Sequence, residues 1–427
     1  MTNSIQAIRG FNDILPADSK TLRQIESQLI AIANQYHYQE IRIPIVEKYD
    51  LFSRSIGDFT DIVNKEMYCF NDRNNQMLAL RPEGTAGCVR AALQHKILDN
   101  NSLCRLWYLG PMFRYERPQK GRARQFNQFS IEAFAMPSGS IDVELIHIAK
   151  RIFERLSLPL TLEINWLGEK SCRLRFQEKL VAYFKSHESA LTADEVERLH
   201  HNPIRLLDSK NPIVQELCRE APQLVDSLSS QQREQFDHYR QLLDDCSIKY
   251  TINPNLVRGL DYYNGAVFEW TTQALGSQSA VCAGGRYDGL IHDLGGKPNH
   301  AAGFSIGIER LYELYQCHHE RSDNQPDVYI IGLGQSSQAT CLSLSEKLHD
   351  ECQNIRSFFA CEQTSSLKTQ LKKADKLGAQ WVFIIGEYET NQATYQLKNM
   401  RHPERSHQGS LTECLTRIKE NHAEESS

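Results

Sequence analysis

The chain has 427 residues, enough for two or three domains, and its 41% hydrophobic and 24% charged residues are ordinary for a folded protein. Its formal net charge is −5, so any site for a polyanion must be a local basic patch. No apolar stretch predicts a signal peptide or a membrane span, and the 12 cysteines form no CxxC pair. These features favour a cytoplasmic protein and exclude a disulfide framework.

The first elements of the chain are predicted from hydrophobic spacing. Apolar residues three or four apart over 19–38 predict an amphipathic helix. IRIPIVE (41–47), which contains a proline, predicts an edge or terminal strand. Within 66–82, EMYCF and QMLALRP flank a turn-rich NDRNN and predict an antiparallel hairpin. A helix with a threonine cap is expected over Thr85–Gln94.

A second hairpin, with a basic loop at its tip, is predicted from LWYLGPMFRYE (106–116) and QFNQFSIEAF (125–134). Alternation places Gln128 and Glu132 on a polar face, where we expect them opposite Arg114 across the ladder. The positive residues at and beside the tip are Arg114, Arg117, Lys120, Arg122 and Arg124. Like charges in one loop repel unless they meet an anion, and guanidinium groups match phosphate geometry.

Residues 168–250 have helical spacing and few strand-like runs, which predicts a helical insertion between two halves of a β-rich domain. Beyond it, LVRGLDYY and AVFEW flank Asn264–Gly265, a type I′ hairpin signal. Residues 301–314 pass from an alternating strand into a helix. A polar linker (322–327) precedes strands and helices that alternate, as in a small α/β domain.

Several common sites are excluded by their missing motifs. There is no GxxxxGK[ST], GxSxG or HExxH, and GLGQSS (332–337) lacks the last glycine of a dinucleotide fingerprint. The sequence CHHE (317–320) has no partner cluster, so no protein-held metal site is predicted.

Three separated arginines, Arg114, Arg258 and Arg310, stand without a nearby general base, which favours electrostatic catalysis of phosphoryl or nucleotidyl transfer. A second polar set is suited to the ammonium and ring nitrogens of a small ligand, although tyrosines on strands are also common in cores. This set comprises Glu83, Gln128, Glu132, Tyr262, Tyr263 and Tyr287.

Plain structural roles for the arginines remain open at this level. Arg258 can pair with Asp261, and Arg310 can pair with Glu309 or Glu313 on its own helix. Such a pair would satisfy one arginine, whereas the basic loop carries four further positive charges.

Several segments carry a family resemblance. FRYERPQKGRARQFNQFSIEAF (113–134) resembles motif 2 of the class II aminoacyl-tRNA synthetases, GFSIGIERL (303–311) resembles their motif 3, and IRIPIVE resembles the looser motif 1. LVRGLDYYNG (256–265) and GGRYDGL (284–290) are similar to two peptides particular to histidyl-tRNA synthetases. NPIRLLDSKN (202–211) also resembles this family, and the match covers nearly the whole chain.

The resemblance implies an α+β fold whose catalytic core is an antiparallel six-stranded sheet flanked by helices. It implies a catalytic domain over 1–325, interrupted by the helical insertion 168–250 near the tRNA acceptor arm, and an α/β anticodon-binding domain over 326–427. It also implies a cytoplasmic homodimer.

The activity implied is ligation of L-histidine to its tRNA, through a histidyl-adenylate formed from ATP in the presence of Mg²⁺. The alternatives are the synthetase-like regulatory subunit of ATP phosphoribosyltransferase, which is not catalytic, and a synthetase-derived RNA-binding module. The intact arginines and residues 327–420 disfavour the first, and the lack of an extra domain disfavours the second.

Site residues carry over from the family by position. The catalytic arginines would be Arg114 and Arg258 on the α-phosphate and Arg310 on the γ-phosphate. The ATP site would comprise Arg114, Glu116, Arg122, Phe126 and Arg310. The histidine site would comprise Glu83, Thr85, Gln128, Glu132, Arg258, Tyr262, Tyr263 and Tyr287. The tRNA acceptor end would meet Arg117, Gln119 and Arg124. Because strand alternation separates Tyr262 from Tyr263, both can line one pocket only if the backbone bends locally.

Overall fold

The computed structural model describes residues 5–57, 60–99, 102–119, 121–209, 211–276, 280–319, 325–352, 355–360 and 365–425. The chain forms two compact units, Met1–Arg321 and Ser322–Ser427. Lys120 of the basic loop and residues 322–324 of the predicted linker lie outside the described residues.

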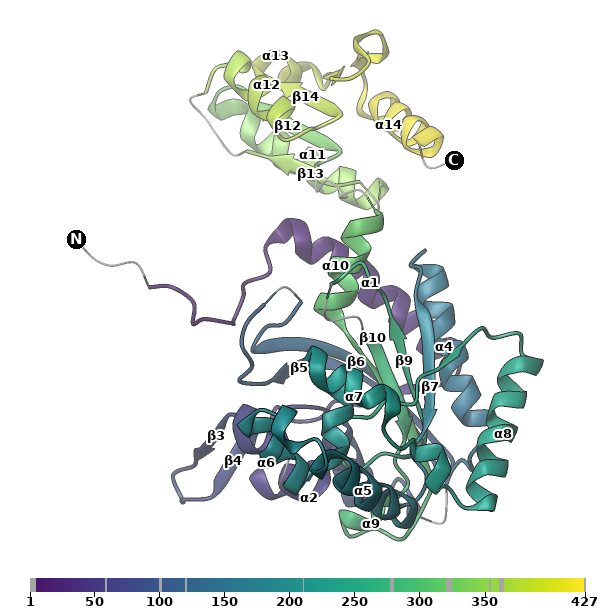
Figure 1. Cartoon of the computed structure of the whole chain (residues 1–427). Coiled ribbons are helices and arrows are strands. Elements are labelled where there is room, and N and C mark those ends of the chain that lie inside the picture. The colour runs from purple at the N-terminus through teal and green to yellow at the C-terminus, as the bar shows by residue number, and fades with distance from the viewer. Residues whose placement is uncertain are drawn as a thin grey trace. The chain divides into compact units, whose positions relative to one another are not determined.

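The first unit is built on a large sheet with the strand order β1-β5-β6-β11-β10-β9-β7-β8 (Figure 1). Its strands are β1 (Gln39–Glu40), β5 (Cys104–Phe113), β6 (Gln125–Phe134), β7 (Thr161–Trp166), β8 (Thr251–Ile252), β9 (Asn264–Thr271), β10 (Ala280–Arg286) and β11 (Ala301–Gly307). The six long strands pair antiparallel throughout, whereas the two-residue strands β1 and β8 add parallel pairs at the edges. The predicted six-stranded antiparallel core is confirmed.

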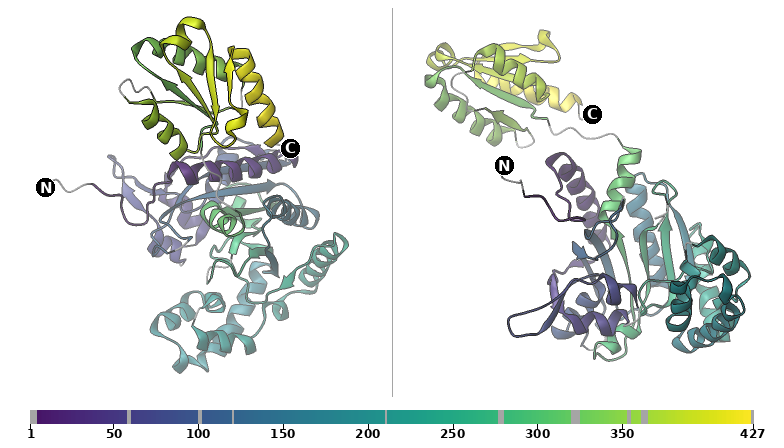
Figure 2. Two further views of the ribbon diagram at one scale, coloured as in Figure 1. Left: turned by 90° about the horizontal axis from the view of Figure 1, so that it is seen from above. Right: turned by 60° about the vertical axis from the view of Figure 1, so that its left-hand side comes forward.

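Three helices pack together against the apolar face of this sheet. They are α1 (Pro16–Gln35), α4 (Ser140–Arg155) and α10 (Ile308–His318). In the right-hand view of Figure 2, α1 (purple) and α10 (green) lie side by side. The predicted alternation of β6 is confirmed, because Phe129, Ile131 and Ala133 are fully buried beneath these helices. The polar face of the hairpin is thereby left for the site.

A small sheet, β2-β4-β3, lies beside α2 (Tyr49–Ile56). Its strands are β2 (Val46–Lys48), β3 (Cys69–Asn71) and β4 (Met77–Leu80), so the predicted hairpin is confirmed. The strand predicted over 41–47 is mostly wrong, because only its last two residues enter β2. The carbonyls of Ile43 and Pro44 accept hydrogen bonds from the Arg81 guanidinium, at 2.8 and 3.3 Å, instead of joining a ladder.

The predicted insertion is helical, and α8 packs on α4 and β9. Its α-helices are α5 (Lys170–Lys185), α6 (Ala193–His201), α7 (Pro212–Glu220) and α8 (Ser230–Asp245). The 3-10 helix η4 (Pro203–Asp208) lies between α6 and α7. A short helix, α9 (Gly289–Asp293), follows β10.

The hairpin predicted at Asn264–Gly265 is wrong. Residues 253–263 form a loop, and Asn264 is the first residue of β9. Gly265 adopts φ of 59°, as the dipeptide favours, but β9 pairs with β7 and β10, which flank it on both sides. The two residues therefore lead a loop into a central strand.

The second unit has its own five-stranded sheet, of order β13-β12-β14-β15-β16, and its own core. The strands are β12 (Val328–Gly332), β13 (Ser357–Phe359), β14 (Trp381–Ile385), β15 (Tyr395–Asn399) and β16 (His407–Gly409). The helices are α11 (Gln338–Glu351), α12 (Leu367–Lys376), α13 (Glu387–Gln392) and α14 (Leu411–Glu425). Within the described parts of both units, no helix has the length and apolar character needed to cross a membrane.

Candidate active site

A cavity of about 370 Å³ opens on the polar face of the large sheet and brings the three predicted arginines together. Arg114 directly follows β5, Arg258 lies in the loop before β9, and Arg310 lies in the first turn of α10. Arg122 of the basic loop lines the same cavity, as do Glu116, Phe126 and Gln128. Residues almost 200 positions apart therefore bring four arginines to one cavity.

Two of these arginines are fixed by backbone carbonyls. Arg114 donates from Nε to the Pro82 carbonyl at 2.8 Å, and its guanidinium lies 5.3 Å from the centre of the Phe126 ring. Arg310 donates from Nη1 to the Ala280 carbonyl at 2.7 Å. Burial, and then the nearby charge of Arg122, lower the pKa of Arg310 below its usual value. Positive charges are thus held close together, as a binding site for a polyanion requires.

The predicted alternative for Arg310 is wrong, because neither acid on its helix is its partner. Glu309 accepts hydrogen bonds from the backbone and side-chain nitrogens of Asn127, at 2.9 Å each. Glu313 accepts a hydrogen bond from the Gly121 backbone at 2.9 Å. The helix acids thereby fix the base and the tip of the basic loop.

The alternative for Arg258 is also wrong. Its guanidinium pairs with Glu269 of β9 at 2.5 Å, not with Asp261, and lies 5.1 Å from the centre of the Tyr263 ring. Tyr263 belongs to a buried cluster of acids and tyrosines, so Arg258 stands between that buried cluster and the arginine-lined cavity.

The expected position of Arg114 opposite Gln128 and Glu132 is wrong. The Arg114 backbone pairs with Arg124 at 2.9 Å, whereas Gln128 and Glu132 pair with residues near the middle of β5. The register follows from the loop, which joins Phe113 to its partner Gln125. A simple cross-strand Arg114–Glu132 pair is therefore excluded.

Glu132 is the centre of the buried cluster. Its carboxylate accepts hydrogen bonds from Thr85 Oγ1 at 2.8 Å, Tyr108 OH at 2.9 Å and the Tyr287 hydroxyl. All four side chains are buried. Burial raises the pKa of Glu132 to about 8, although the three hydroxyl donors oppose this rise. The group therefore holds its proton at neutral pH more readily than an ordinary glutamate.

Glu83 provides a second buried carboxylate in this buried cluster. It accepts hydrogen bonds from the backbone nitrogens of Thr85 at 2.6 Å and Ala86 at 2.9 Å, and from the Tyr262 hydroxyl at 3.5 Å. Burial raises its pKa, and the two backbone amides oppose the rise. The predicted helix is confirmed as α3 (Thr85–Gln94), but the threonine cap is wrong. Glu83 occupies the first amides, and the Thr85 hydroxyl turns to Glu132.

Three tyrosine rings of the buried cluster pack against one another. The ring centres of Tyr262 and Tyr263 lie 4.8 Å apart, and those of Tyr262 and Tyr287 lie 5.6 Å apart. Tyr262 and Tyr263 both enter the buried cluster because they lie in a loop rather than a strand. Tyr108 was missed by the sequence analysis as a site residue. Its alternation with Met112 on β5 was the available signal.

The three residues expected to meet tRNA differ in their exposure to solvent. Arg117 and Gln119 are exposed on the basic loop. Arg124 is half-buried, with its guanidinium 3.7 Å from the centre of the Tyr115 ring and Nε donating to the Glu116 carbonyl at 3.3 Å. Its contacts hold the base of the loop.

Comparison with known proteins identifies the family. Residues 10–168 and 173–311 match the family model described as "Histidyl-tRNA synthetase", and residues 327–421 match "Anticodon binding domain". The chain belongs to the histidyl-tRNA synthetase family. It is 48% identical to a histidine–tRNA ligase of Hydrogenovibrio crunogenus over 405 residues, which cover 94% of each chain. The predicted family is confirmed.

Solved structures agree with this assignment. The apo histidyl-tRNA synthetase of S. aureus matches with a TM-score of 0.78 and 34% identity, over 97% of this chain and 100% of that chain. An ATP phosphoribosyltransferase regulatory subunit/histidyl-tRNA synthetase from Bacillus halodurans C matches with a TM-score of 0.65 and 20% identity, over 90% and 99%. The second likeness shows the fold alone. The predicted class II fold is confirmed.

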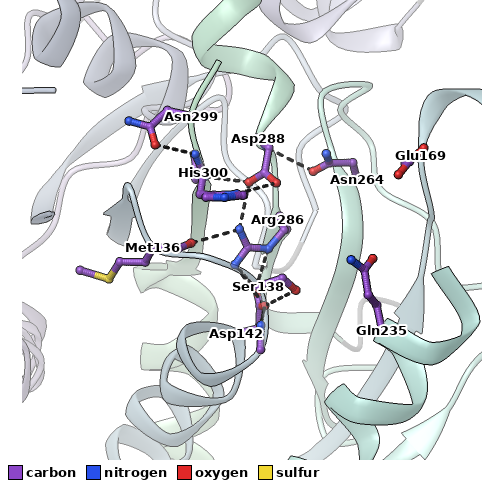
Figure 3. Close-up of polar contacts among 12 residues, drawn as sticks. Met136, Ser138, Asp142, Glu169, Gln235, Asn264, Arg286, Asp288, Asn299 and His300 are labelled. Atoms are coloured by element: carbon purple, nitrogen blue, oxygen red, sulfur yellow. Dashed lines mark hydrogen bonds and ion pairs between the residues drawn. The ribbon is translucent and has the colours of Figure 1, made fainter. Parts of the chain in front are cut away.

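The family peptide GGRYDGL contributes Arg286 and Asp288 to an ion network (Figure 3). Arg286, 3% exposed, donates to both carboxylate oxygens of Asp142 at 3.1 Å and to Asp288 at 2.9 Å. Asp288 in turn accepts from the Ala301 backbone at 2.8 Å, and Asp142 accepts from the Gly139 backbone at 2.7 Å. Figure 3 shows these groups converging from three segments. The network fixes the backbone next to Tyr287.

Carboxylates suited to a magnesium ion also line the arginine cavity. Three partly buried acids line it: Glu116 and Glu269 each pair with an arginine, whereas Glu309 accepts from Asn127. Proteins usually hold Mg²⁺ through one or two carboxylates together with substrate phosphates, so these residues fit the ion. Among the described residues, no group of three His, Cys, Asp or Glu side chains could hold a metal by itself.

Proposed function

We propose that this chain is a histidine–tRNA ligase, which activates L-histidine with ATP and transfers histidine to the 3′ end of its tRNA. The observation that carries this proposal is the junction at Arg258. There a cavity lined by arginines lies next to the buried cluster of Glu132 and the tyrosines. The 48% identity to a histidine–tRNA ligase supports the enzyme over the regulatory subunit.

The arginine-lined cavity binds ATP. Arg114 and Arg258 hold the α-phosphate, Arg310 holds the γ-phosphate, and the remaining ATP-binding residues are Glu116, Arg122 and Phe126. The histidine carboxylate attacks the α-phosphorus, and the bond to the leaving pyrophosphate breaks. Because the carboxylate is already a nucleophile, the protein needs to supply only position and positive charge.

Magnesium, when it accompanies ATP, supplies further neutralisation of charge on the phosphate oxygens. Glu116 and Glu269 are the carboxylates that would hold it. The arginines act on the same oxygens whether or not the ion is bound.

The buried cluster of acids and tyrosines selects histidine. A protonated Glu132 donates a hydrogen bond to one imidazole nitrogen, and the carboxylate of Glu83 attracts the ammonium group. Thr85, Tyr262 and Tyr287 donate to these acids and position them, Tyr263 packs against Tyr262, and Gln128 lines the neighbouring cavity. A pocket whose buried polar groups need an imidazole rejects analogues without hydrogen-bonding groups by about 10⁴–10⁵-fold. No editing step is required.

The tRNA contacts of this proposal divide between the two units. Arg117, Gln119 and Arg124 of the basic loop meet the acceptor end, beside the helical insertion 168–250 of the catalytic domain 1–325. The domain 326–427 reads the anticodon, which is supported by its match to an anticodon-binding family.

The proposed enzyme is a cytoplasmic homodimer. The free thiols of the described cysteines support a reducing compartment. One face of the small sheet supports self-association, because Val46 and Phe70 are 40% and 45% exposed beside half-buried Leu78 and Leu80.

Replacing Phe70 by glutamate is expected to shift sedimentation from dimer to monomer. An unchanged dimer would place the interface elsewhere.

The deciding experiment is ATP–pyrophosphate exchange measured with each of the twenty amino acids in turn. We expect exchange with L-histidine alone, because Glu132 and the tyrosines require an imidazole. Exchange with another amino acid, or with none, would contradict the proposal.

A further inference from the structure

The loop 253–263 carries three residues of the proposed site but has no ladder of its own. It connects β8 to β9, and none of its residues, all of which the structure describes, belongs to a helix or strand. Nevertheless Arg258, Tyr262 and Tyr263 must keep fixed positions, because misplacement of a catalytic group by about 1 Å can cost 10²-fold in rate. Other elements must therefore satisfy the backbone groups of the loop.

Two arginines of the helical insertion meet these carbonyls. Arg205 of η4 donates from Nη2 to the Gly259 carbonyl at 2.5 Å, directly after Arg258 in the chain. Arg173 of α5 donates from Nη1 to the Tyr263 carbonyl at 2.7 Å and to the Asp261 carbonyl at 3.3 Å. The catalytic body holds the start of the loop, where Asn165 of β7 donates from Nδ2 to the Pro254 and Leu256 carbonyls at 3.2 and 3.0 Å. Beyond Arg258 it contributes the bond from the Asp261 backbone nitrogen to the Ile56 carbonyl at 3.1 Å.

These two arginines differ from the surface arginines of the insertion. Arg219 of α7 is an example of the surface kind, because it pairs with Glu216 one turn away at 2.7 Å and has a largely exposed side chain. Arg173 and Arg205 are half-buried, and their side chains donate hydrogen bonds to backbone carbonyls of a distant segment. Burial also lowers the pKa of Arg173. Their partial burial is therefore linked to holding the backbone of the loop in place.

We propose that Arg205 and Arg173 are positioning residues, through which the helical insertion fixes the loop that carries Arg258, Tyr262 and Tyr263. This inference rests on the proposed function. Neither arginine lines the cavity, so neither touches ATP there. The insertion thus contributes to activation of histidine before any tRNA binds.

The test is histidine-dependent ATP–pyrophosphate exchange with the whole chain and no tRNA. Arg205→Ala releases the carbonyl next to Arg258, so kcat should fall by about 10-fold or more. Arg173→Ala releases Tyr263, so the KM for histidine should rise by about 10-fold or more while the KM for ATP changes little. Arg205→Lys can still donate to the Gly259 carbonyl and should recover most of the lost kcat.

Arg219→Ala is the matched control, because it removes an arginine of the same insertion whose side chain pairs with Glu216 of its own helix. It should leave kcat and both KM values unchanged. A melting temperature measured for every variant separates misplacement of the loop from loss of the fold. If Arg205→Ala does not fold, Arg205→Lys and Arg173→Ala decide.

Wild-type kinetics in either Arg205→Ala or Arg173→Ala would overturn the inference, and so would equal losses in the Arg219→Ala control. An inactive wild-type chain would instead contradict the proposed function. The two failures are therefore distinguishable in one experiment.

Discussion

Arg258 stands where the two halves of the site meet, over the Tyr263 ring and beside Glu269. Arg258→Ala is expected to abolish histidine-dependent exchange, because removal of one group that stabilises developing charge costs about 10²–10³-fold. Binding of tRNA should remain mostly intact, because the proposed tRNA contacts lie on other segments. Exchange rates and a filter-binding assay measure the two effects. Undiminished exchange would refute the role of Arg258.

Glu132 makes stability depend on pH in a direction that can be calculated. Its pKa is about 8 in the folded chain and ordinarily 4.5, so between these values only the folded state keeps the proton. The free energy of unfolding should therefore fall as pH rises, by up to about 1.4 kcal/mol per pH unit from this group. Glu132→Gln removes the titration and should flatten this fall.

Urea titrations of both proteins between about pH 5 and about pH 8 measure the difference in slope. Glu83, whose pKa is also raised, is present in both proteins, so the difference in slope reports the loss of Glu132 together with its interaction with Glu83. Parallel slopes would contradict the assignment to Glu132.

At this scale the sequence could predict residue types but not their partners. Arg114, Arg258 and Arg310 were identifiable from charge and motif, because a cation without a nearby base has a narrow range of roles. The pairing of Arg258 with Glu269, and the contribution of Tyr108, depend on the register between strands. A local pattern does not specify that register.

Single elements were predicted best where short-range signals were sufficient. Helix α3 begins and ends at the expected residues because the small and apolar residues of 85–94 favour a helix locally. The strand over 41–47 and the hairpin at Asn264 failed because long-range partners decided them. Arg81 satisfies the carbonyls of the first, and β10 pairs with the second.

The network of Arg286 allows a test at the level of elements, because it joins β10 to α4. Arg286→Met leaves the buried Asp142 carboxylate without its cation and should lower the free energy of unfolding by about 3–5 kcal/mol. The KM for histidine should rise as well, because Tyr287 follows Arg286 directly. Urea denaturation followed by tryptophan fluorescence, together with exchange kinetics, measures both.

The double variant Arg286→Met, Asp142→Asn provides the control. It removes the uncompensated charge while the amide oxygen can still accept from the Gly139 backbone, so it should regain part of the lost stability. If the single variant unfolds at the same urea concentration as the wild-type chain, the network is not a source of stability.

The whole molecule consists of two units with separate cores, and this separation defines the last test. Val328 and Phe383 are fully buried within the second unit, and Phe129 and Phe304 lie in the core of the first. Deletion of residues 327–427 should therefore leave the first unit folded, with exchange activity close to that of the full chain. Aminoacylation should fall by about 10²-fold or more, because a second linked contact to tRNA is lost. Initial rates of exchange and of aminoacylation, measured on the same preparations, compare the two steps. If both rates fall equally, the second unit supports the fold or the chemistry of the first and is not a separate reader of the tRNA.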